Sequence, residues 1–357
     1  MRILITGGAG FVGSSLAKLY KENHPNSEIT VFDNLKRRGS EINLPVFKKM
    51  GINFTHGDIR NQSDLEDITS NFDFILEASA EPSVHAGTGG QSPRYLLDTN
   101  LNGTLNCLEF ARKKTGGMIF LSTSRVYSIL AIKQIQFREG ITRFEVGDEQ
   151  VVSGISENGI SESFPTVGSG FRSLYGTTKL ASELFIEEYA QNFGFKAIIN
   201  RSGVIAGKGQ FGKTDQGIFT LWVARHLFNG KLSYTGFGGQ GKQVRDILHP
   251  KDLSALLEKQ VQSLSTWDGS VYNIGGGHSG SVSLLEYTKL CEGVTGNSID
   301  IGANPETALV DIPYYVSDSK KASEKFQWDP KVSPKEIVQE ISDWINSDRV
   351  NLEAIFS

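Results

Sequence analysis

The sequence predicts an α/β protein, with a Rossmann-type doubly wound parallel sheet followed by a smaller α/β C-terminal lobe. Three observations lead to this fold class. Short β-type runs alternate with helix-length stretches over the first 201 residues, as in a parallel sheet built from βα units. A glycine cluster stands between the first run and the first helix, as in dinucleotide-binding folds. Residues 206–245 are glycine-rich and precede a further set of amphipathic helices.

The expected elements follow in order along the chain. The β-type runs are residues 2–6, 29–32, 52–56, 72–76, 117–122 and 196–201. Helical spacing of Leu97, Leu101, Leu105 and Leu108 predicts a helix between the fourth and fifth runs, and a similar pattern predicts a helix over 334–347. We expect residues 1–205 to form a nucleotide-binding domain that also receives about 246–276. Residues 206–357 would then form mainly a substrate-binding lobe.

Composition limits the possible partners and compartments. The chain has 357 residues and a formal net charge of −4, so no basic surplus favours nucleic acid or an anionic membrane. Cys107 and Cys291 lie far apart in apolar contexts, which indicates reduced core residues. No targeting signal and no run of 18 apolar residues occurs. We expect a cytoplasmic protein without a membrane span.

The glycine cluster predicts the site of a dinucleotide. Gly7, Gly10 and Gly13 have G-x-x-G-x-x-G spacing, which allows a tight turn, close approach of the backbone to a pyrophosphate and close packing of helix on strand. Phe11 and Val12 would open the helix, whose free N–H groups and partial positive charge attract phosphate. A plain flexible turn is the alternative for the glycines alone.

Acidic residues after the second and third runs bear on the choice of cofactor. Asp33 stands twenty positions after Gly13, where a carboxylate binds ribose hydroxyls and repels a 2′-phosphate, so NAD is favoured. Asn34 follows it, and Lys36 begins a basic run that would suit NADP. Asp58 is either a reader of the adenine amino group or an ordinary turn residue.

Tyr175 and Lys179 are the candidate catalytic pair. Residues four apart share one face of a helix. An ammonium near the phenol favours the phenolate, and lowering its pKa by about three units requires roughly 4 kcal/mol. That stabilisation needs a partly desolvated site. The alternative is a helix surface that carries two long polar side chains.

Several motifs together resemble the extended short-chain dehydrogenase/reductase family of sugar-nucleotide epimerases and dehydratases. They are "TGGAGFVG", "FDNL", "GDIR", "TNLNGTLNCLEFAR", "FLSTSRVY", "YGTTK" and "VRDILH", in the family's order. The resemblance covers nearly the whole chain. It implies a third catalytic residue, Thr123, and NAD contacts from Asp58, Ile59, Ala78, Ser79, Asn100 and Lys179, as well as from the glycine segment.

Departures from the family pattern narrow the reaction. Ser124 and Arg125 stand where dehydratases carry Asp-Glu, so dehydration is disfavoured. The histidine that the family often carries after the fourth run is absent from "ILEASAEPSV", and Val204 replaces an expected asparagine. These differences argue against a standard UDP-galactose 4-epimerase pocket.

Within the family the pattern is most similar to the 2-epimerases of CDP-activated 6-deoxyhexoses. A small polar and a basic residue follow Thr123, Tyr127 and Tyr175 are 48 positions apart, and the similarity extends to segments 209–219 and 239–249. This resemblance implies substrate contacts from Ser124, Arg125, Gln210, Phe211, Gln216 and Arg245. The Arg245 guanidinium would bind the diphosphate, with a structural ion pair to Asp246 as the alternative.

The function expected from these residues is NAD-dependent epimerisation of a nucleotide sugar through a keto intermediate. Alternatives are a UDP-sugar 4-epimerase, another oxidoreductase or dehydratase of the family, or a non-catalytic NAD sensor, which would not need Thr123, Tyr175 and Lys179. No metal site is expected from the six scattered histidines. The resemblance implies a homodimer through helices at 102–112 and 175–189, with an apolar stripe of Leu180, Leu184 and Phe185.

Overall fold

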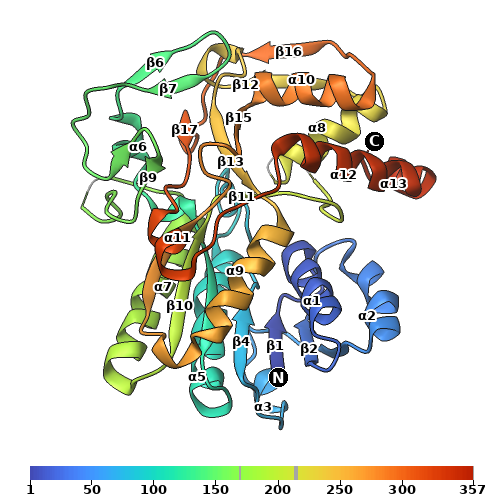
Figure 1. The fold of residues 1–357 in the computed structure, drawn as a ribbon, viewed down its shortest axis with the longest axis vertical. Coiled ribbons are helices and arrows are strands. Elements are labelled where there is room, and N and C mark those ends of the chain that lie inside the picture. The colour runs from blue at the N-terminus through green and yellow to red at the C-terminus, as the bar shows by residue number, and fades with distance from the viewer. Residues whose placement is uncertain (169, 213–215, 357) are drawn as a thin grey trace. The chain divides into compact units, whose positions relative to one another are not determined.

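A computed structural model gives the fold and describes residues 1–168, 170–212 and 216–356 (Figure 1). The chain divides into two compact units. The first unit consists of Met1–Val126, Ser173–Arg201 and Leu253–Tyr272, and the second of Tyr127–Arg172, Ser202–Asp252 and Asn273–Ser357. The two units are therefore of similar length.

The insertion at 127–172 belongs to the second unit, whereas the expected domain boundary at 205 leaves it with the first. Its backbone is bonded to second-unit segments. Ile160 forms an isolated bridge with Ser317, and the Asn273 side chain donates to the Ile160 carbonyl at 2.8 Å. Residues 253–272 return to the first unit.

A seven-stranded sheet has the order β14-β10-β5-β4-β1-β2-β3. The pairings from β5 through β4, β1 and β2 to β3 are parallel. The strands are β1 Arg2–Thr6, β2 Glu28–Asp33, β3 Asn53–His56, β4 Phe74–Glu77, β5 Met118–Thr123, β10 Ala197–Ser202 and β14 Ser270–Ile274. Each of the six predicted runs thus forms a strand, and the doubly wound fold is confirmed. The strand order changes direction between β1 and β4, and the carboxyl ends of strands at such a point form a ligand site in these folds.

Helices accompany this sheet in the first unit. They are α1 Phe11–Asn23, α2 Leu44–Met50, α3 Gln62–Glu66, α4 Arg94–Leu97, α5 Gly103–Lys114, α7 Leu174–Phe193 and α9 Pro250–Gln262. The core contains Leu4, Phe32, Ile75 and Phe120, each almost fully buried. Burial on both faces explains why these strands read as continuous apolar runs. The predicted leucine helix is interrupted by a π-helical turn, Asp98–Asn102.

The second unit combines short strands and longer helices. Its four-stranded sheet contains β11 Val204–Ile205, β13 Val244–Leu248, β15 Ser281–Ser283 and β17 Tyr314–Tyr315. Pairs of short strands are β6 Phe137–Glu139 with β7 Phe144–Val146, β8 Ile155–Ser156 with β9 Gly159–Ile160, and β12 Leu232–Thr235 with β16 Ile301–Asn304. The helices are α6 Ile129–Lys133, α8 Ile218–Leu227, α10 Leu284–Thr295, α11 Lys320–Phe326, α12 Pro334–Ser347 and α13 Arg349–Phe356.

Helix α12 forms over the residues that the sequence predicts. The Ser333 hydroxyl accepts from the Glu336 N–H, and the Glu336 carboxylate accepts from the Ser333 N–H, which makes a capping box. Ile337, Val338 and Ile341 then enter an apolar core shared with α8 and α10.

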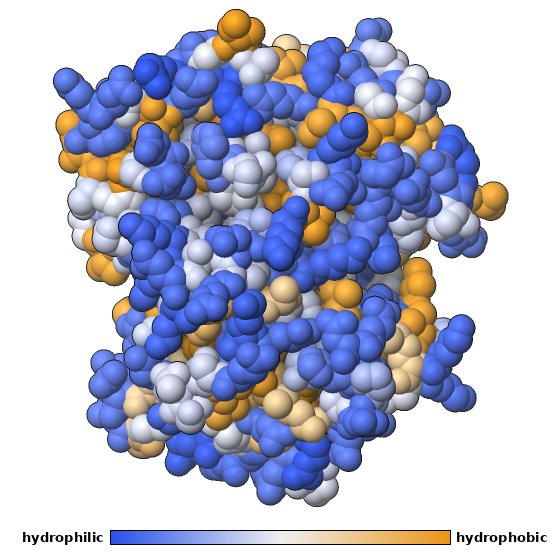
Figure 2. Space-filling view, viewed as in Figure 1, coloured by the Kyte–Doolittle hydropathy of each residue, from blue (hydrophilic) through white to orange (hydrophobic). Residues whose placement is uncertain are grey.

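The molecular surface is mixed in polarity. On the face shown in Figure 2, polar residues surround small apolar groups. Over the described residues, no helix combines the length and the apolar character that crossing a membrane requires.

Candidate active site

The turn between β1 and α1 requires glycine for steric reasons. Gly7 has φ +64°, and a Cβ at Gly7 would lie 2.7 Å from the backbone N and Cα of Ser79. A Cβ at Gly13 would lie 2.5 Å from the Gly7 carbonyl oxygen. Glycine therefore lets the turn rest on the backbone of Ala78 and Ser79, and lets α1 rest on the turn.

The start of α1 offers backbone donors to an anion. Gly10 is the N-cap, no side chain caps the helix, and the Ser14 N–H donates to the Gly10 carbonyl at 2.9 Å. The N–H groups of Phe11, Val12 and Gly13 precede that bond, and such groups at a helix start need outside acceptors. This arrangement fits the pyrophosphate of a dinucleotide.

Asp33 is fixed beside the glycine turn. Its side chain is at the end of β2 and is 8% exposed. One carboxylate oxygen accepts from the Ala9 N–H at 3.0 Å and the other from the Leu35 N–H at 2.8 Å. Burial raises the pKa of Asp33, while these backbone hydrogen bonds oppose the rise. Each oxygen keeps acceptor capacity, so the carboxylate fits ribose hydroxyls.

Asn34, Lys36 and Asp58 lie in one cluster, joined through Arg60 and Tyr95. Asn34 donates to Asp58 at 2.9 Å, and Arg60 pairs with Asp58 at 2.6 Å. Burial raises the pKa of Asp58, but hydrogen bonds from Arg60 and Asn34 outweigh it and lower the pKa to about 2. The Lys36 ammonium lies 4.0 Å from the ring centroid of Tyr95, and the Arg60 guanidinium carbon lies 4.9 Å from it. Asp58 is therefore ionised and both cations rest on an aromatic ring.

Two of the expected cofactor contacts, Asn100 and Ile59, have buried side chains. Asn100 is fully buried in the π-helical turn, where its amide accepts from the Glu81 N–H at 2.8 Å and donates to the Glu81 carbonyl at 3.0 Å. Ile59 is 5% exposed and packs in the apolar core. Asn100 thus fixes the chain that follows Ala78 and Ser79.

Helix α7 begins beside the end of β5. The Ser173 hydroxyl accepts from the Gly176 N–H at 3.1 Å and caps the helix. A Cβ at Gly176 would lie 2.1 Å from the Arg125 carbonyl oxygen, so the helix start lies directly on the turn after Thr123. Tyr175 and Lys179 are 9% and 2% exposed. This burial excludes the alternative of two polar side chains on a helix surface.

Thr123 and Tyr175 are in contact, but the pKa of Tyr175 differs from the expectation. Burial raises this pKa, while a hydrogen bond with Thr123 and the charge of Arg125 oppose the rise. The Tyr175–Lys179 spacing predicts that the Lys179 ammonium lowers the pKa of Tyr175. Instead, the Lys179 ammonium lies 4.2 Å from the ring centroid of Phe120.

Two buried carboxylates near Lys179, those of Glu77 and Glu183, were not predicted from the sequence. Burial lowers the pKa of Lys179, while Glu77 and Glu183 raise it. Glu183 lies one helical turn after Lys179, and it pairs with Arg201 at 2.6 Å. The i+4 spacing from Lys179 could have signalled Glu183. Glu77 had no local signal beyond its position at the end of a strand.

Gln210 and Phe211 make contacts within the second unit. Gln210 donates to the Ile205 carbonyl at 3.0 Å and accepts from the Thr220 hydroxyl at 2.8 Å. The Phe211 ring centroid lies 5.8 Å from that of Trp344. Residues 213–215 of the similar segment 209–219 lie outside the described residues.

Arg245 is held by backbone carbonyls of the second unit. Its guanidinium donates to the carbonyls of Val244 and Ile312, each at 2.7 Å. The Asp246 carboxylate accepts from the N–H of Ser317 at 3.1 Å. Gln216 is partly buried. Ser124 and Arg125, the other expected substrate contacts, form the turn beside Tyr175 in the first unit.

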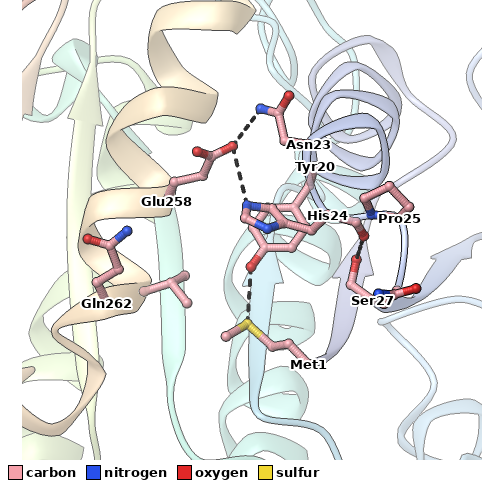
Figure 3. A pocket seen from close by; sticks show the side chains of 10 residues that line it. Met1, Tyr20, Asn23, His24, Pro25, Ser27, Glu258 and Gln262 are labelled. Atoms are coloured by element: carbon pink, nitrogen blue, oxygen red, sulfur yellow. Dashed lines mark hydrogen bonds and ion pairs between the residues drawn. The ribbon is translucent and has the colours of Figure 1, made fainter.

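Two other observations concern sites elsewhere. Within the described ranges, no group of three or more His, Cys, Asp or Glu side chains could hold a metal ion. A pocket of about 460 Å³ is lined by Met1, Tyr20, His24, Glu258 and neighbouring residues (Figure 3). Because Met1 precedes β1, this pocket lies at the amino edge of the sheet, away from the carboxyl edge where Gly7 follows β1.

Comparison with known proteins assigns this fold and site to a family. The model of the NAD dependent epimerase/dehydratase family matches residues 3–275, and the chain belongs to that family. It is accordingly an NAD-dependent enzyme that acts on nucleotide sugars.

Particular relatives refine the assignment. Over 359 residues the chain is 34% identical to the CDP-paratose 2-epimerase of Salmonella typhi, covering 97% of this chain and 100% of the relative. It is 27% identical to a UDP-glucose 4-epimerase of Erwinia amylovora, with 96% and 97% covered. The fold is similar to that of UDP-glucose 4-epimerase from Bifidobacterium longum in complex with NAD+ and UDP, with a TM-score of 0.77, 22% identity and 98% and 99% coverage. The predicted family and the Rossmann-type fold are confirmed.

Proposed function

We propose that the enzyme inverts C2 of a CDP-activated 6-deoxyhexose, converting CDP-paratose to CDP-tyvelose or acting on a close analogue. The observation that carries this proposal is the 34% identity to CDP-paratose 2-epimerase, which covers 97% of this chain and 100% of the relative. Identity to the UDP-glucose 4-epimerase is lower, at 27%. The turn after Thr123 argues against the dehydratase alternative, because Ser124 and Arg125 supply no acid for eliminating water.

The cofactor would occupy the carboxyl edge of the sheet in the first unit. Gly7, Gly10 and the start of α1 would hold the pyrophosphate, and Asp33 the adenosine ribose. The remaining expected contacts would line the site: Asn34, Lys36, Asp58, Ile59, Ala78, Ser79, Asn100, Tyr175 and Lys179. When bound, NAD accepts a hydride from the sugar carbon and returns it to the opposite face of the sugar.

Tyr175 would move the proton of the reacting hydroxyl. The Thr123 hydroxyl forms a hydrogen bond with the Tyr175 phenol. With substrate bound, it would orient the reacting sugar hydroxyl. Because burial raises the pKa of Tyr175, the phenol stays neutral until positive charge is brought beside it. Lys179 would supply part of that charge. The keto sugar would then rotate before its carbon is reduced again.

The second unit would bind the nucleotide part of the substrate. The Arg245 guanidinium, oriented by two carbonyl groups, is suited to a diphosphate. Gln210, Phe211 and Gln216 of the same unit would also contact the substrate. Ser124 and Arg125 would contact the sugar, and the Arg125 charge would also favour the Tyr175 phenolate.

A homodimer is also proposed, through α5 and α7. Leu184 is 50% and Phe185 43% exposed on α7, whereas Leu180 is buried and drops out of the expected stripe. Leu184→Glu should turn a dimer into a monomer in light scattering. Leu309→Glu, at a residue 69% exposed in the second unit, is the matched control. A wild-type monomer at micromolar concentration would contradict the dimer.

The test of the proposed function is a substrate panel. The purified enzyme is incubated with CDP-, UDP-, GDP- and dTDP-sugars, and the products are identified by NMR. We expect CDP-paratose to yield CDP-tyvelose without net consumption of added NAD. Epimerisation of UDP-sugars at C4 with CDP-sugars untouched would establish the 4-epimerase alternative. Consumption of free NAD would indicate a dehydrogenase.

A further inference from the structure

Glu77 is a carboxylate buried beneath the candidate active site. It ends β4 and is 0% exposed. In the parallel sheet it pairs in register with Thr6 of β1 and Phe120 of β5. Register partners in neighbouring strands present their side chains on the same face. The Lys179 ammonium rests 4.2 Å from the centroid of the Phe120 ring, and therefore on the face that carries Glu77.

Apart from Lys179, the neighbours of Glu77 named here carry no positive charge. The Thr104 hydroxyl of α5 lies 3.3 and 3.2 Å from the two carboxylate oxygens. Cys107, also on α5, is fully buried and lies close enough for its thiol to feel the charge of Glu77. From α7, Lys179 supplies the positive charge that acts on Glu77. Thr6 and Phe120 complete the surroundings from the strands.

The second carboxylate near Lys179 already has a partner. Glu183 accepts hydrogen bonds from the Arg201 guanidinium at 2.6 and 3.0 Å through one oxygen and at 3.1 Å through the other, which also accepts from Ser122. Glu183 and Arg201 thus balance each other. A lysine that is 2% exposed needs a counter-charge of its own.

We propose that Glu77 is the buried counterion that keeps Lys179 protonated, and so acts as a positioning residue for the charge beside Tyr175. This proposal rests on the proposed roles of Tyr175 and Lys179. It assigns a function to a position where the family pattern often has histidine. In this chain the strand end supplies a negative charge instead.

The electrostatics of the pair agree with this role. Burial raises the pKa of Glu77 to about 7, while Lys179 and Thr104 oppose the rise. Burial lowers the pKa of Lys179, and Glu77 is the largest opposing influence. Above neutral pH Glu77 is therefore anionic and sustains the ammonium. Removing the carboxylate charge should let Lys179 lose its proton at lower pH.

The test is Glu77→Gln, which keeps the side-chain size and an acceptor for Thr104. Two quantities are measured on the NAD-loaded enzyme: the pH dependence of kcat, and the titration of the Lys179 side chain by NMR with ¹³C-labelled lysine. Lys179→Met assigns the signal. We expect the alkaline limb of the profile and the Lys179 titration both to move down by about one pH unit or more, a tenfold change in proton affinity.

The control is Glu258→Gln, a carboxylate of the same unit that pairs with Asn23 at the amino edge (Figure 3). It should leave both quantities unchanged. Glu77→Asp, which restores the charge, should bring the titration back toward wild type. If Glu77→Gln does not fold, Glu77→His removes the same negative charge with the residue that the family often carries, and the same downward shift is expected.

In Glu77→Gln, kcat could fall equally at all pH values while the alkaline limb and the Lys179 titration stay in place. That result would overturn the proposal and show that Glu77 has a structural role only. The NMR titration needs no substrate. If it shifts while no CDP-sugar is turned over, the proposed substrate is wrong and the counterion role stands. If turnover is found but the titration stays in place, the counterion role fails alone.

Discussion

Comparison of Gly7 with Gly51 distinguishes the cost of a side chain at positive φ from the cost of a steric clash with neighbouring backbone. Both have positive φ, +64° and +68°, but a Cβ at Gly7 would overlap the Ser79 backbone at 2.7 Å, whereas nothing lies within 4 Å of one at Gly51. Alanine at either position costs about 1 kcal/mol of folding free energy from the backbone conformation. Only Gly7→Ala should also displace the turn.

We expect Gly7→Ala to abolish retention of NAD and Gly51→Ala to preserve it. The measurement is the NAD released when equal amounts of each purified variant are denatured, together with urea unfolding to compare stabilities. Retention of wild-type NAD by Gly7→Ala would contradict the assignment of the turn to the pyrophosphate.

Tyr175→Phe removes the proposed proton carrier and leaves the glycine turn intact. We expect kcat to fall by about 10²- to 10⁴-fold, with bound NAD retained. Tyr189→Phe is the matched control on the same helix, since its hydroxyl bonds Glu109 at 2.6 Å outside the site. Near-wild-type kcat in Tyr175→Phe would reject the proton-transfer role.

Sequence patterns point most directly to residues whose chemistry depends on local spacing. The glycines, Asp33 and the Tyr175–Lys179 pair are recognisable because a turn or a helix alone sets their geometry. Glu77 and the Glu183–Arg201 pair are different. They matter because β4, β5, α5 and α7 pack together, and no local pattern encodes that packing.

The N-cap of helix α7 should affect both the stability of the protein and the position of Tyr175. Ser173 caps α7 and Ser333 caps α12, each by accepting from the N–H three residues on. Replacing either with alanine should cost about 1 kcal/mol of unfolding free energy. Because Tyr175 lies in the first turn of α7, only Ser173→Ala should also lower kcat. Equal kcat in both variants at matched folding would contradict a role of that cap in positioning Tyr175.

The strands were predictable as elements, whereas the interruption of one predicted helix was not. Each of the six apolar runs forms a strand because burial on both faces leaves an unmistakable pattern. The leucine-spaced stretch instead contains the π-helical turn Asp98–Asn102. Its Asn100 side chain is bonded to the backbone of Glu81. The spacing of apolar residues cannot indicate a hydrogen bond to a residue so distant in sequence.

The pH dependence of the unfolding free energy depends on carboxyl groups in both units. Burial raises the pKa of Glu77 to about 7 and that of Asp246 to about 6. Their protonated forms stabilise the fold at low pH, and this contribution is lost as pH rises through 6 to 7. Although burial raises the pKa of Glu286 and Glu340, hydrogen bonds from Arg143 and His249 respectively outweigh it and lower both to about 2.

The stabilisation from Glu286 and Glu340 is therefore present above the ordinary carboxyl pKa and lost as pH falls toward 2. We expect the unfolding free energy, measured by urea titration from pH 2 to pH 8, to peak between about pH 4 and 6. Glu286→Gln should weaken the acid-side loss. A free energy that rises steadily from pH 4 to 8 would contradict the buried, raised carboxyls.

The division into units was only partly predictable. Residues 253–272 belong to the first unit, although they follow the second unit's segment 202–252 in the sequence. Assignment of 127–172 to the second unit depends on pairings such as Ile160 with Ser317, which join segments far apart in sequence. Short strands of two or three residues leave too little pattern for such pairings to be read in advance.

Inversion at C2 by oxidation and re-reduction of one carbon is the central claim. CDP-paratose deuterated at C2 is converted in ordinary water, unlabelled substrate is converted in heavy water, and both products are examined by NMR. The proposed chemistry predicts CDP-tyvelose that keeps deuterium at C2 in the first case and carries no carbon-bound deuterium in the second, because Tyr175 exchanges only a hydroxyl proton. Solvent deuterium on a ring or methyl carbon, or inversion at C4 with C2 untouched, would contradict the claim.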